Sequence, residues 1–228
     1  MIPEAGLILD AGTGLYRARD LICTRHLDIL LSHVHLDHVI GLTFLFDILY
    51  EKTVDRITVH VAESKIKAIQ EHLFAQDLFP VQPPFEIRPI KTTRPFTLNS
   101  ALQVTPIPVV HPGGCYAFRL DGLPGGRSMA YVTDTTADSQ ADYVGAIRDV
   151  DTLIHECYFP DGWEAKAELT GHSCLTSVAQ VARAAAVGSC YLVHINPLND
   201  GEVPLDLTSA KTIFNNIQVP SDQQIIDL

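Results

Sequence analysis

Three histidines and one aspartate occupy six consecutive positions of the chain, in the segment His33-Val34-His35-Leu36-Asp37-His38. Alternate side chains of an extended chain share a face, so we expect His33, His35 and Asp37 to converge and His38 to point elsewhere. Imidazole and carboxylate groups are the usual ligands of zinc and related divalent ions. The cluster suits two neighbouring metal ions better than one, because one ion with four protein ligands would keep no open position for chemistry.

Four more residues of the same chemical types follow expected strands or precede an expected helix. His111, Asp134 and His194 stand at the ends of apolar runs, and His172 precedes a helical run in Gly171-His172-Ser173. A rigid sheet holds such side chains in place while they face solvent. Taken alone, a residue such as His111 is usually a satisfied polar residue, and one such as Asp134 is more often a turn or cap residue. We interpret His155 as structural because it lies inside an apolar run, and the remaining histidines, His26, His60 and His72, as surface or packing residues.

Short strands and helices alternate along the chain and are expected to position these residues. Apolar runs bounded by glycine, proline or polar residues predict strands, and amphipathic or alanine-rich runs predict helices. We expect strands at 7–9, 27–31, 57–61, 85–89, 102–110, 115–120, 128–133, 152–155, 190–193 and 224–226, and helices at 39–50, 65–74, 175–186 and 207–217. The pattern predicts sheets packed together with helices outside, in a single domain of residues 1–228.

The charge and composition of the chain exclude several classes of protein. Hydrophobic residues make up 46% and the net charge is −11, which supports a buried core and argues against an extended nucleic-acid-binding surface. A small anionic substrate remains compatible, because bound cations dominate the charge of a metal site. The five cysteines include no C-x-x-C pair, and no signal peptide or membrane-spanning run of about 18 apolar residues is present, so we expect a cytoplasmic protein without a membrane partner.

The segment from His33 to His38 resembles the signature of the metallo-β-lactamase superfamily, with His111, Asp134 and His194 following in the family's order. Gly171-His172-Ser173 and Leu153-Ile154-His155-Glu156 are similar to the catalytic histidine and acidic segments of ribonuclease Z. Three other segments look like short bacterial phosphodiesterases of that branch, namely Leu9-Asp10-Ala11-Gly12-Thr13-Gly14, Leu78-Phe79-Pro80-Val81 and His111-Pro112-Gly113-Gly114.

The resemblance implies an α/β fold, the metallo-β-lactamase αββα four-layer sandwich, and a site for two Zn²⁺ ions, with Mn²⁺ or iron as alternatives. It assigns His33, His35, His111 and Asp134 to one ion, and Asp37, His38, His194 and Asp134 to the other, with Asp134 bridging. Asp10 would be a buried residue that braces the ligand loop. The family usually has further strands before residue 7, so we expect a fold that lacks the first N-terminal strands and has an exposed sheet edge. Either a homodimer covers that edge or the chain is an N-terminally shortened version of the family.

The function implied is hydrolysis of a phosphodiester in a small molecule or nucleotide by a hydroxide shared between the two ions. Asp37 would orient that hydroxide, and His172, oriented by Glu156, would protonate the leaving oxygen. Two alternatives remain open: a thioester or lactone hydrolase of the glyoxalase II type, and transfer-RNA 3′ processing like that of ribonuclease Z. The chain lacks the Gly/Pro-rich arm with which ribonuclease Z grips transfer RNA, which makes the latter the weaker alternative.

Overall fold

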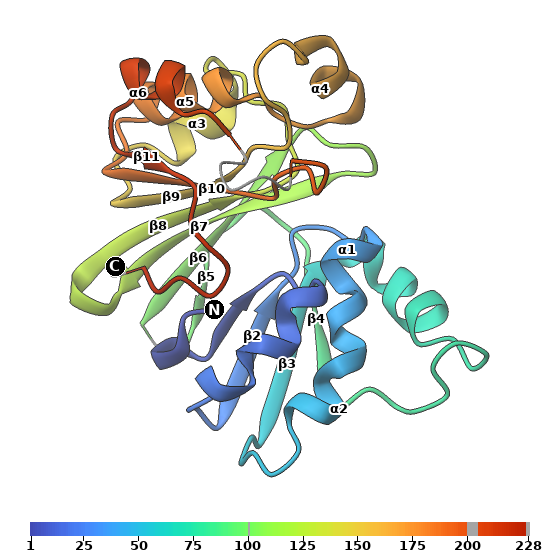
Figure 1. Cartoon of the computed structure of the whole chain (residues 1–228). Helices are drawn as coiled ribbons and strands as arrows, with labels where there is room; N and C mark the ends of the chain where they lie inside the picture. Colours follow the sequence, from blue (N-terminus) through green and yellow to red (C-terminus); the bar gives the residue numbers. More distant parts are fainter. Residues whose placement is uncertain (100, 200–204, 227–228) are drawn as a thin grey trace. The chain divides into compact units, whose positions relative to one another are not determined.

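The computed structural model describes residues 1–99, 101–199 and 205–226, and the chain divides into two compact units, residues 1–93 and 94–228. Each unit contains one β-sheet together with helices of its own (Figure 1). The α/β content with two sheets agrees with the fold class predicted from the sequence.

The first unit is built on a four-stranded parallel sheet in the order β1-β2-β3-β4. The strands are β1 (Leu7–Leu9), β2 (His26–Leu30), β3 (Arg56–Ala62) and β4 (Glu86–Ile90), close to the four predicted from the apolar runs. Strand β1 stands at the edge of the sheet, and the loops that leave β1 and β2 carry Asp10 and the His33–His38 segment.

Alternation along these strands sends one set of apolar side chains to the helical face of the sheet. Residues such as Ile29 and Val59 pack in one core with Leu42 and Leu45. The helical part of this unit comprises α1 (Leu36–Val39), α2 (Leu45–Ile48), a π-helix (Ala68–Leu73) and the 3-10 segments Pro3–Ala5, Thr13–Leu21, Ile40–Phe44 and Glu63–Lys65.

The single helix predicted for residues 39–50 is therefore broken. Gly41 lies in the 3-10 segment between α1 and α2, and its N–H donates to the Ala11 carbonyl oxygen at 2.7 Å. A Cβ at this position would overlap the carbonyl oxygens of Gly12 and Ala11. The helix bends here because it packs directly on the backbone of the loop after β1, a close approach that only glycine permits.

The second unit is built on a seven-stranded sheet in the order β11-β10-β9-β8-β7-β6-β5. Strands β5 to β8 pair antiparallel and β8 to β11 pair parallel. Their bounds are β5 (Phe96–Leu98), β6 (Leu102–Val109), β7 (Cys115–Leu123), β8 (Arg127–Val132), β9 (Thr152–Glu156), β10 (Ser189–Val193) and β11 (Ile217–Gln218).

The closing strand predicted at 224–226 is wrong. Residues 217–218 pair with β10 instead, and the described residues after them, 219–226, form no strand. The helix predicted for residues 207–217 is also shorter than expected. Helix α6 ends at Ile213, and the chain after it runs in an extended conformation to the sheet. A two-residue strand suffices for β11 because only one of its residues, Ile217, is buried.

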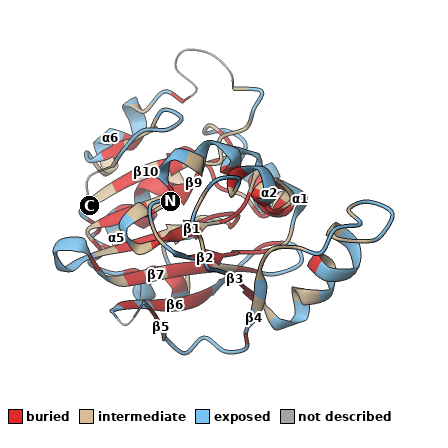
Figure 2. Cartoon of the chain, turned by 90° about the horizontal axis from the view of Figure 1, so that it is seen from below, coloured by how far each residue is buried: buried red, intermediate tan, exposed pale blue. Residues whose placement is uncertain are grey.

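Helices α3 (Asp142–Ala146), α5 (Leu175–Ala184) and α6 (Thr208–Ile213) lie on one face of this sheet, and α4 (Glu164–Thr170) follows β9 (Figure 1). The buried residues of α5 pack against Leu153 and Leu192 of the sheet, and burial is concentrated along the strands (Figure 2). Among residues 1–99, 101–199 and 205–226, no helix combines the length and apolar character that a membrane crossing requires.

Candidate metal centre

The histidine cluster of the first unit lies at the start of α1 rather than on an extended strand. The ring centroid of His33 is 4.5 Å from that of His35 and 4.2 Å from that of His38. His38 Nε2 is 3.4 Å from Asp37 Oδ2, because both residues occupy the same helical turn. The expectation that His38 points away from the cluster is therefore wrong, since it assumed an extended chain where a helix begins.

Asp10 braces this cluster from beneath, as predicted. Its carboxylate is buried and accepts hydrogen bonds from the Ser32 N–H at 2.7 Å and the Ser32 hydroxyl at 2.7 Å. His38 Nδ1 lies 2.9 Å from the Asp10 carboxylate and donates to it, which leaves Nε2 as the nitrogen with the ligand lone pair. A histidine that donates one nitrogen to a carboxylate is the usual arrangement behind a metal ligand.

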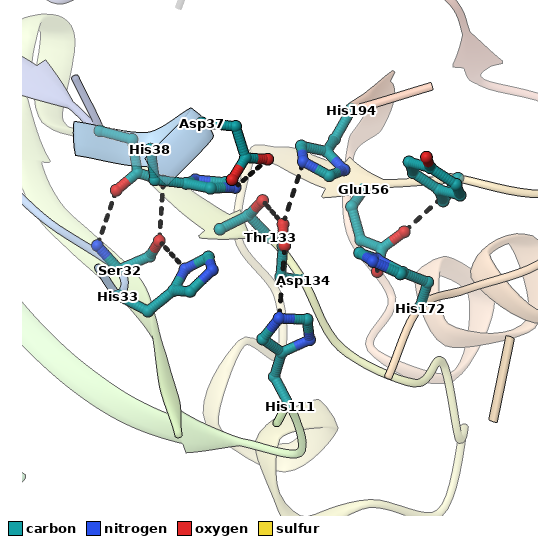
Figure 3. Close-up of polar contacts among 12 residues, drawn as sticks. Ser32, His33, Asp37, His38, His111, Thr133, Asp134, Glu156, His172 and His194 are labelled. Carbon is teal, nitrogen blue, oxygen red and sulfur yellow. Dashed lines mark hydrogen bonds and ion pairs between the residues drawn. The ribbon is translucent and has the colours of Figure 1, made fainter. Parts of the chain in front are cut away.

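Asp134 is the central carboxylate of the second unit (Figure 3). It is buried, and its two oxygens face different histidines: Oδ2 is 3.6 Å from His111 Nε2, and Oδ1 is 3.5 Å from His194 Nε2. The Thr133 hydroxyl also donates to Oδ1 at 2.6 Å. A carboxylate flanked on each oxygen by a histidine has the form expected of a group that serves two ions.

The ring of His111 is held from behind by the loop before α5. His111 Nδ1 donates to the Gly171 carbonyl oxygen at 2.9 Å, so Nε2 is the nitrogen presented to Asp134. Gly171 has φ of +73°, and a Cβ there would lie 2.5 Å from Pro112 Cδ and 2.9 Å from His111 Nδ1. Glycine is required at this position both by the backbone conformation and by the contact with the ring.

Glu156 and the partly exposed His172 form a pair in the same unit. Glu156 is fully buried, and His172 Nδ1 lies 3.1 Å from its Oε1. The carboxylate also accepts three backbone N–H groups, from Thr135 at 2.9 Å, Tyr158 at 3.0 Å and Ser173 at 3.2 Å. Glu156 is thus close enough to orient His172, as the sequence predicts. The three N–H groups and the imidazole around this carboxylate suit an acceptor that carries a negative charge.

Three polar residues at strand ends have left-handed backbone conformations. Asp10 after β1 has φ of +55°, Asp134 after β8 has +42° and His194 after β10 has +53°. Such values are uncommon outside glycine and cost on the order of 1–3 kcal/mol each. The chain turns sharply at the point where each strand delivers a side chain, which is the kind of strain that gathers at functional sites.

The donor set of each unit fits divalent metal ions. The first unit offers imidazoles and the Asp37 carboxylate, and in the second unit one ligand atom from each of Asp134, His172 and His194 lies within 4.8 Å of the others. Nitrogen and oxygen donors backed by carboxylate or carbonyl acceptors suit Zn²⁺, Mn²⁺ and iron. The first unit thus holds His33, His35, Asp37 and His38, and the second holds His111, Asp134 and His194.

His155 has the structural role expected of it. It is fully buried, its Nδ1 donates to the Glu156 carbonyl oxygen at 2.7 Å, and its Nε2 faces the Tyr143 hydroxyl at 3.2 Å. Burial lowers the pKa of His155 and raises the pKa of Tyr143, so both groups are neutral near pH 7. His60, by contrast, is a buried residue paired with Asp28 at 2.7 Å, while His26 and His72 are exposed.

Tyr158 is a site residue that the sequence analysis missed. Its ring stacks on His172 with centroids 4.6 Å apart and planes at 19°, and its centroid is 5.7 Å from that of His194. The only signal was its position two residues after Glu156 at a strand end, which does not reveal where the ring lies.

Comparison with known proteins identifies the family. Residues 7–195 match the model described as the beta-lactamase superfamily domain. A ribonuclease Z of Cyanothece is 38% identical over 101 residues, 42% of this chain and 31% of that protein. A ribonuclease Z of Bradyrhizobium diazoefficiens is 25% identical over 288 aligned residues, 97% of this chain and 90% of that protein. The metallo-β-lactamase fold protein YhfI of Bacillus subtilis superposes with a TM-score of 0.74 at 19% identity, over 95% of this chain and 85% of that one.

Each of these comparisons supports the resemblance seen in the motifs. The match to the Cyanothece protein spans about a third of that protein's length, whereas the family match includes most of this chain and both of its units. The likeness to YhfI confirms the predicted metallo-β-lactamase fold. The chain therefore belongs to the beta-lactamase superfamily domain family, with relatives named ribonuclease Z.

Proposed function

We propose that the chain is a metal-dependent phosphodiesterase acting on a small phosphodiester or nucleotide. The observation that carries the proposal is the arrangement of the second unit, where Asp134 lies between two histidines and His172 is paired with the buried Glu156. Phosphodiester hydrolysis at a two-metal site uses a carboxylate that can bind both ions and an acid that protonates the leaving oxygen. Asp134 would have the first role and His172 the second.

The ligand sets of the two units would together hold two divalent ions, in our proposal Zn²⁺. One ion would take His33, His35, His111 and Asp134, and the other Asp37, His38, His194 and Asp134, an assignment that rests on the family's pattern and on the donors present in each unit. Bound there, the ions would polarise the phosphoryl group and lower the pKa of water to about 7. Asp37, whose side chain is largely exposed, would orient the attacking water.

His172 would donate the proton that the leaving oxygen needs. Its Nδ1 is engaged by Glu156, so Nε2 is the nitrogen available for transfer. Glu156 would hold the ring in place through this contact while the proton is transferred. A dedicated proton donor favours a phosphodiester substrate over a thioester, because an alkoxide leaving group has to be protonated and a thiolate leaving group does not.

A second candidate is a ribonuclease Z-like activity on precursor transfer RNA, which the names of the relatives favour. The net charge of −11 weighs against it, because gripping an extended RNA requires many Lys and Arg contacts to phosphates. We propose a small-molecule substrate, a cytoplasmic location and a homodimer that covers the edge of β1.

The test combines metal content with turnover. We would measure bound metal by mass spectrometry and hydrolysis of bis-p-nitrophenyl phosphate, a thioester and a precursor transfer RNA. The variants are Asp134→Ala and, as a matched control, Asp138→Ala, an exposed aspartate in the following loop. Two metals per chain and phosphodiester turnover that disappears only in Asp134→Ala would support the proposal. Turnover of the thioester alone, or full activity of Asp134→Ala, would refute it.

A further inference from the structure

Tyr158 is held firmly at the end of β9 by its backbone. Its N–H donates to Glu156 Oε2 at 3.0 Å, and its carbonyl oxygen accepts the Asn196 N–H at 3.2 Å. The next residue, Phe159, is buried and bonds through its N–H to the Ser173 carbonyl oxygen at 3.0 Å. The same three segments that carry Glu156, His172 and His194 therefore fix the position of Tyr158.

The ring of Tyr158 lies face to face with the ring of His172. The centroids are 4.6 Å apart and the planes differ by 19°, which is a stacked arrangement, whereas His111 approaches the same imidazole edge-on at 5.3 Å and 61°. Phe159 supports the tyrosine from the side, with centroids 4.9 Å apart and planes at 74°. Stacked and edge-to-face contacts of this kind restrict ring rotation.

Two constraints are needed to aim an imidazole nitrogen, because the ring has two side-chain torsions. The Glu156 carboxylate selects which edge of His172 faces inward, through the 3.1 Å contact with Nδ1. This single contact does not determine the plane of the ring, since one distance cannot fix two side-chain torsions. Two rings lie nearly parallel to that of His172: His194 at 5.6 Å and 21°, and Tyr158 at 4.6 Å and 19°. Tyr158 makes the closer face contact and supplies the second constraint, which together with the Glu156 contact sets the direction of Nε2.

We propose that Tyr158 is a positioning residue that fixes the plane of the His172 imidazole for proton transfer to the leaving group. The inference rests on the proposed phosphodiesterase function. It assigns the role to the aromatic face and not to the hydroxyl, so phenylalanine should substitute for tyrosine while an aliphatic residue should not. The effect should depend on the leaving group, because a phenolate departs without a proton and an alkoxide does not.

The experiment compares Tyr158→Phe, Tyr158→Leu and the matched control Tyr191→Leu, which removes a half-buried tyrosine of β10. Each metal-loaded variant is assayed on bis-p-nitrophenyl phosphate, with its phenolate leaving group, and on a deoxydinucleoside phosphate, with its alkoxide. We expect Tyr158→Leu to lower kcat on the alkoxide substrate about tenfold to a hundredfold and to change KM and the phenolate reaction little, since positioned proton transfer contributes roughly 10²–10⁴. Tyr158→Phe and Tyr191→Leu should stay near wild type on both.

A second readout is independent of catalysis. In metal-free protein, the His172 ring protons should show an upfield NMR shift from the tyrosine ring, kept in Tyr158→Phe and lost in Tyr158→Leu. Equal losses on both substrates, a Phe variant as impaired as the Leu variant, or unchanged His172 shifts would overturn the inference. Wild-type protein that hydrolyses neither phosphodiester would refute the proposed function, and the NMR comparison would still decide whether Tyr158 orients His172.

Discussion

Glu156→Gln should destabilise the protein, although the two side chains have nearly the same shape. Both carboxylate oxygens accept hydrogen bonds in a fully buried site: Oε1 from the Thr135 N–H and His172, and Oε2 from the N–H groups of Tyr158 and Ser173. An amide has one acceptor and one donor end. Whichever end its nitrogen takes, it meets at least one backbone N–H.

The cheaper orientation places the amide nitrogen beside His172 and Thr135. His172 can then accept a hydrogen bond by changing its tautomer, but the Thr135 N–H is left without an acceptor, which costs about 1–3 kcal/mol. The bonds from Tyr158 and Ser173 remain but are no longer charge-assisted, and such bonds lose roughly half their strength. Together these effects should lower the unfolding free energy by about 2–4 kcal/mol.

The assay is urea unfolding of metal-free protein in a chelator, followed by circular dichroism, so that metal binding does not contribute to the difference. The matched control is Glu168→Gln, an exposed glutamate of α4, which should change stability by less than about 0.5 kcal/mol. A Glu156→Gln variant as stable as the control would contradict the reasoning, because it would mean that the buried site does not require a charged acceptor.

Three further predictions follow from the contacts around the site. Burial lowers the pKa of His155, so the unfolded chain binds a proton at a higher pH than the folded protein does. The stability contributed by this residue is complete above about pH 6.5 and declines below it, by no more than about 1.4 kcal/mol at pH 5.5. His155→Gln should lose that decline in urea titrations at pH 7.5 and 5.5. An unchanged pH dependence in that variant would count against a neutral buried His155. Gly171→Ala should lower the melting temperature and zinc content more than Gly162→Ala, since both positions have positive φ but only Gly171 has atoms that a Cβ would overlap. The two variants should differ in unfolding free energy by about 1–3 kcal/mol, and equal losses would refute the steric argument. Asp10→Asn should weaken zinc binding about 10–100-fold in competition with a chelator, with exposed Asp20→Asn as the control, and equal affinities would exclude a bracing role.

Much of the site was readable from the sequence because its residues stand where strands end. The strands predicted at 7–9, 128–133 and 190–193 stop directly before Asp10, Asp134 and His194, so strand prediction and ligand prediction supported each other. The His-x-His-x-Asp-His segment was recognisable because so many imidazoles so close together serve no packing purpose. These features are local in the chain, which is why a single sequence reveals them.

The weaker predictions concern short elements whose existence depends on burial against the rest of the fold. Strand β5 and helices α3 and α4 have three to seven residues and no periodicity long enough to detect. The apolar tail at 224–226 looked like a strand, yet Ile217–Gln218 occupies that edge of the sheet. A short segment pairs with β10 only if the preceding helix delivers it there, and this is a property of the tertiary structure.

The sequence alone thus indicates which residues are candidate metal ligands. It does not determine how their side chains are oriented. His38 joins its neighbours because α1 begins at Leu36, and Gly171 is required because His111 packs against it. Tyr158 lies on His172 because the next residue, Phe159, bonds through its N–H to the Ser173 carbonyl oxygen. Each of these contacts joins a side chain to a backbone turn or to a residue distant in the chain. Only the folded protein brings such partners together, because ring planes and tautomers are set by packing and hydrogen bonds that the unfolded chain does not have.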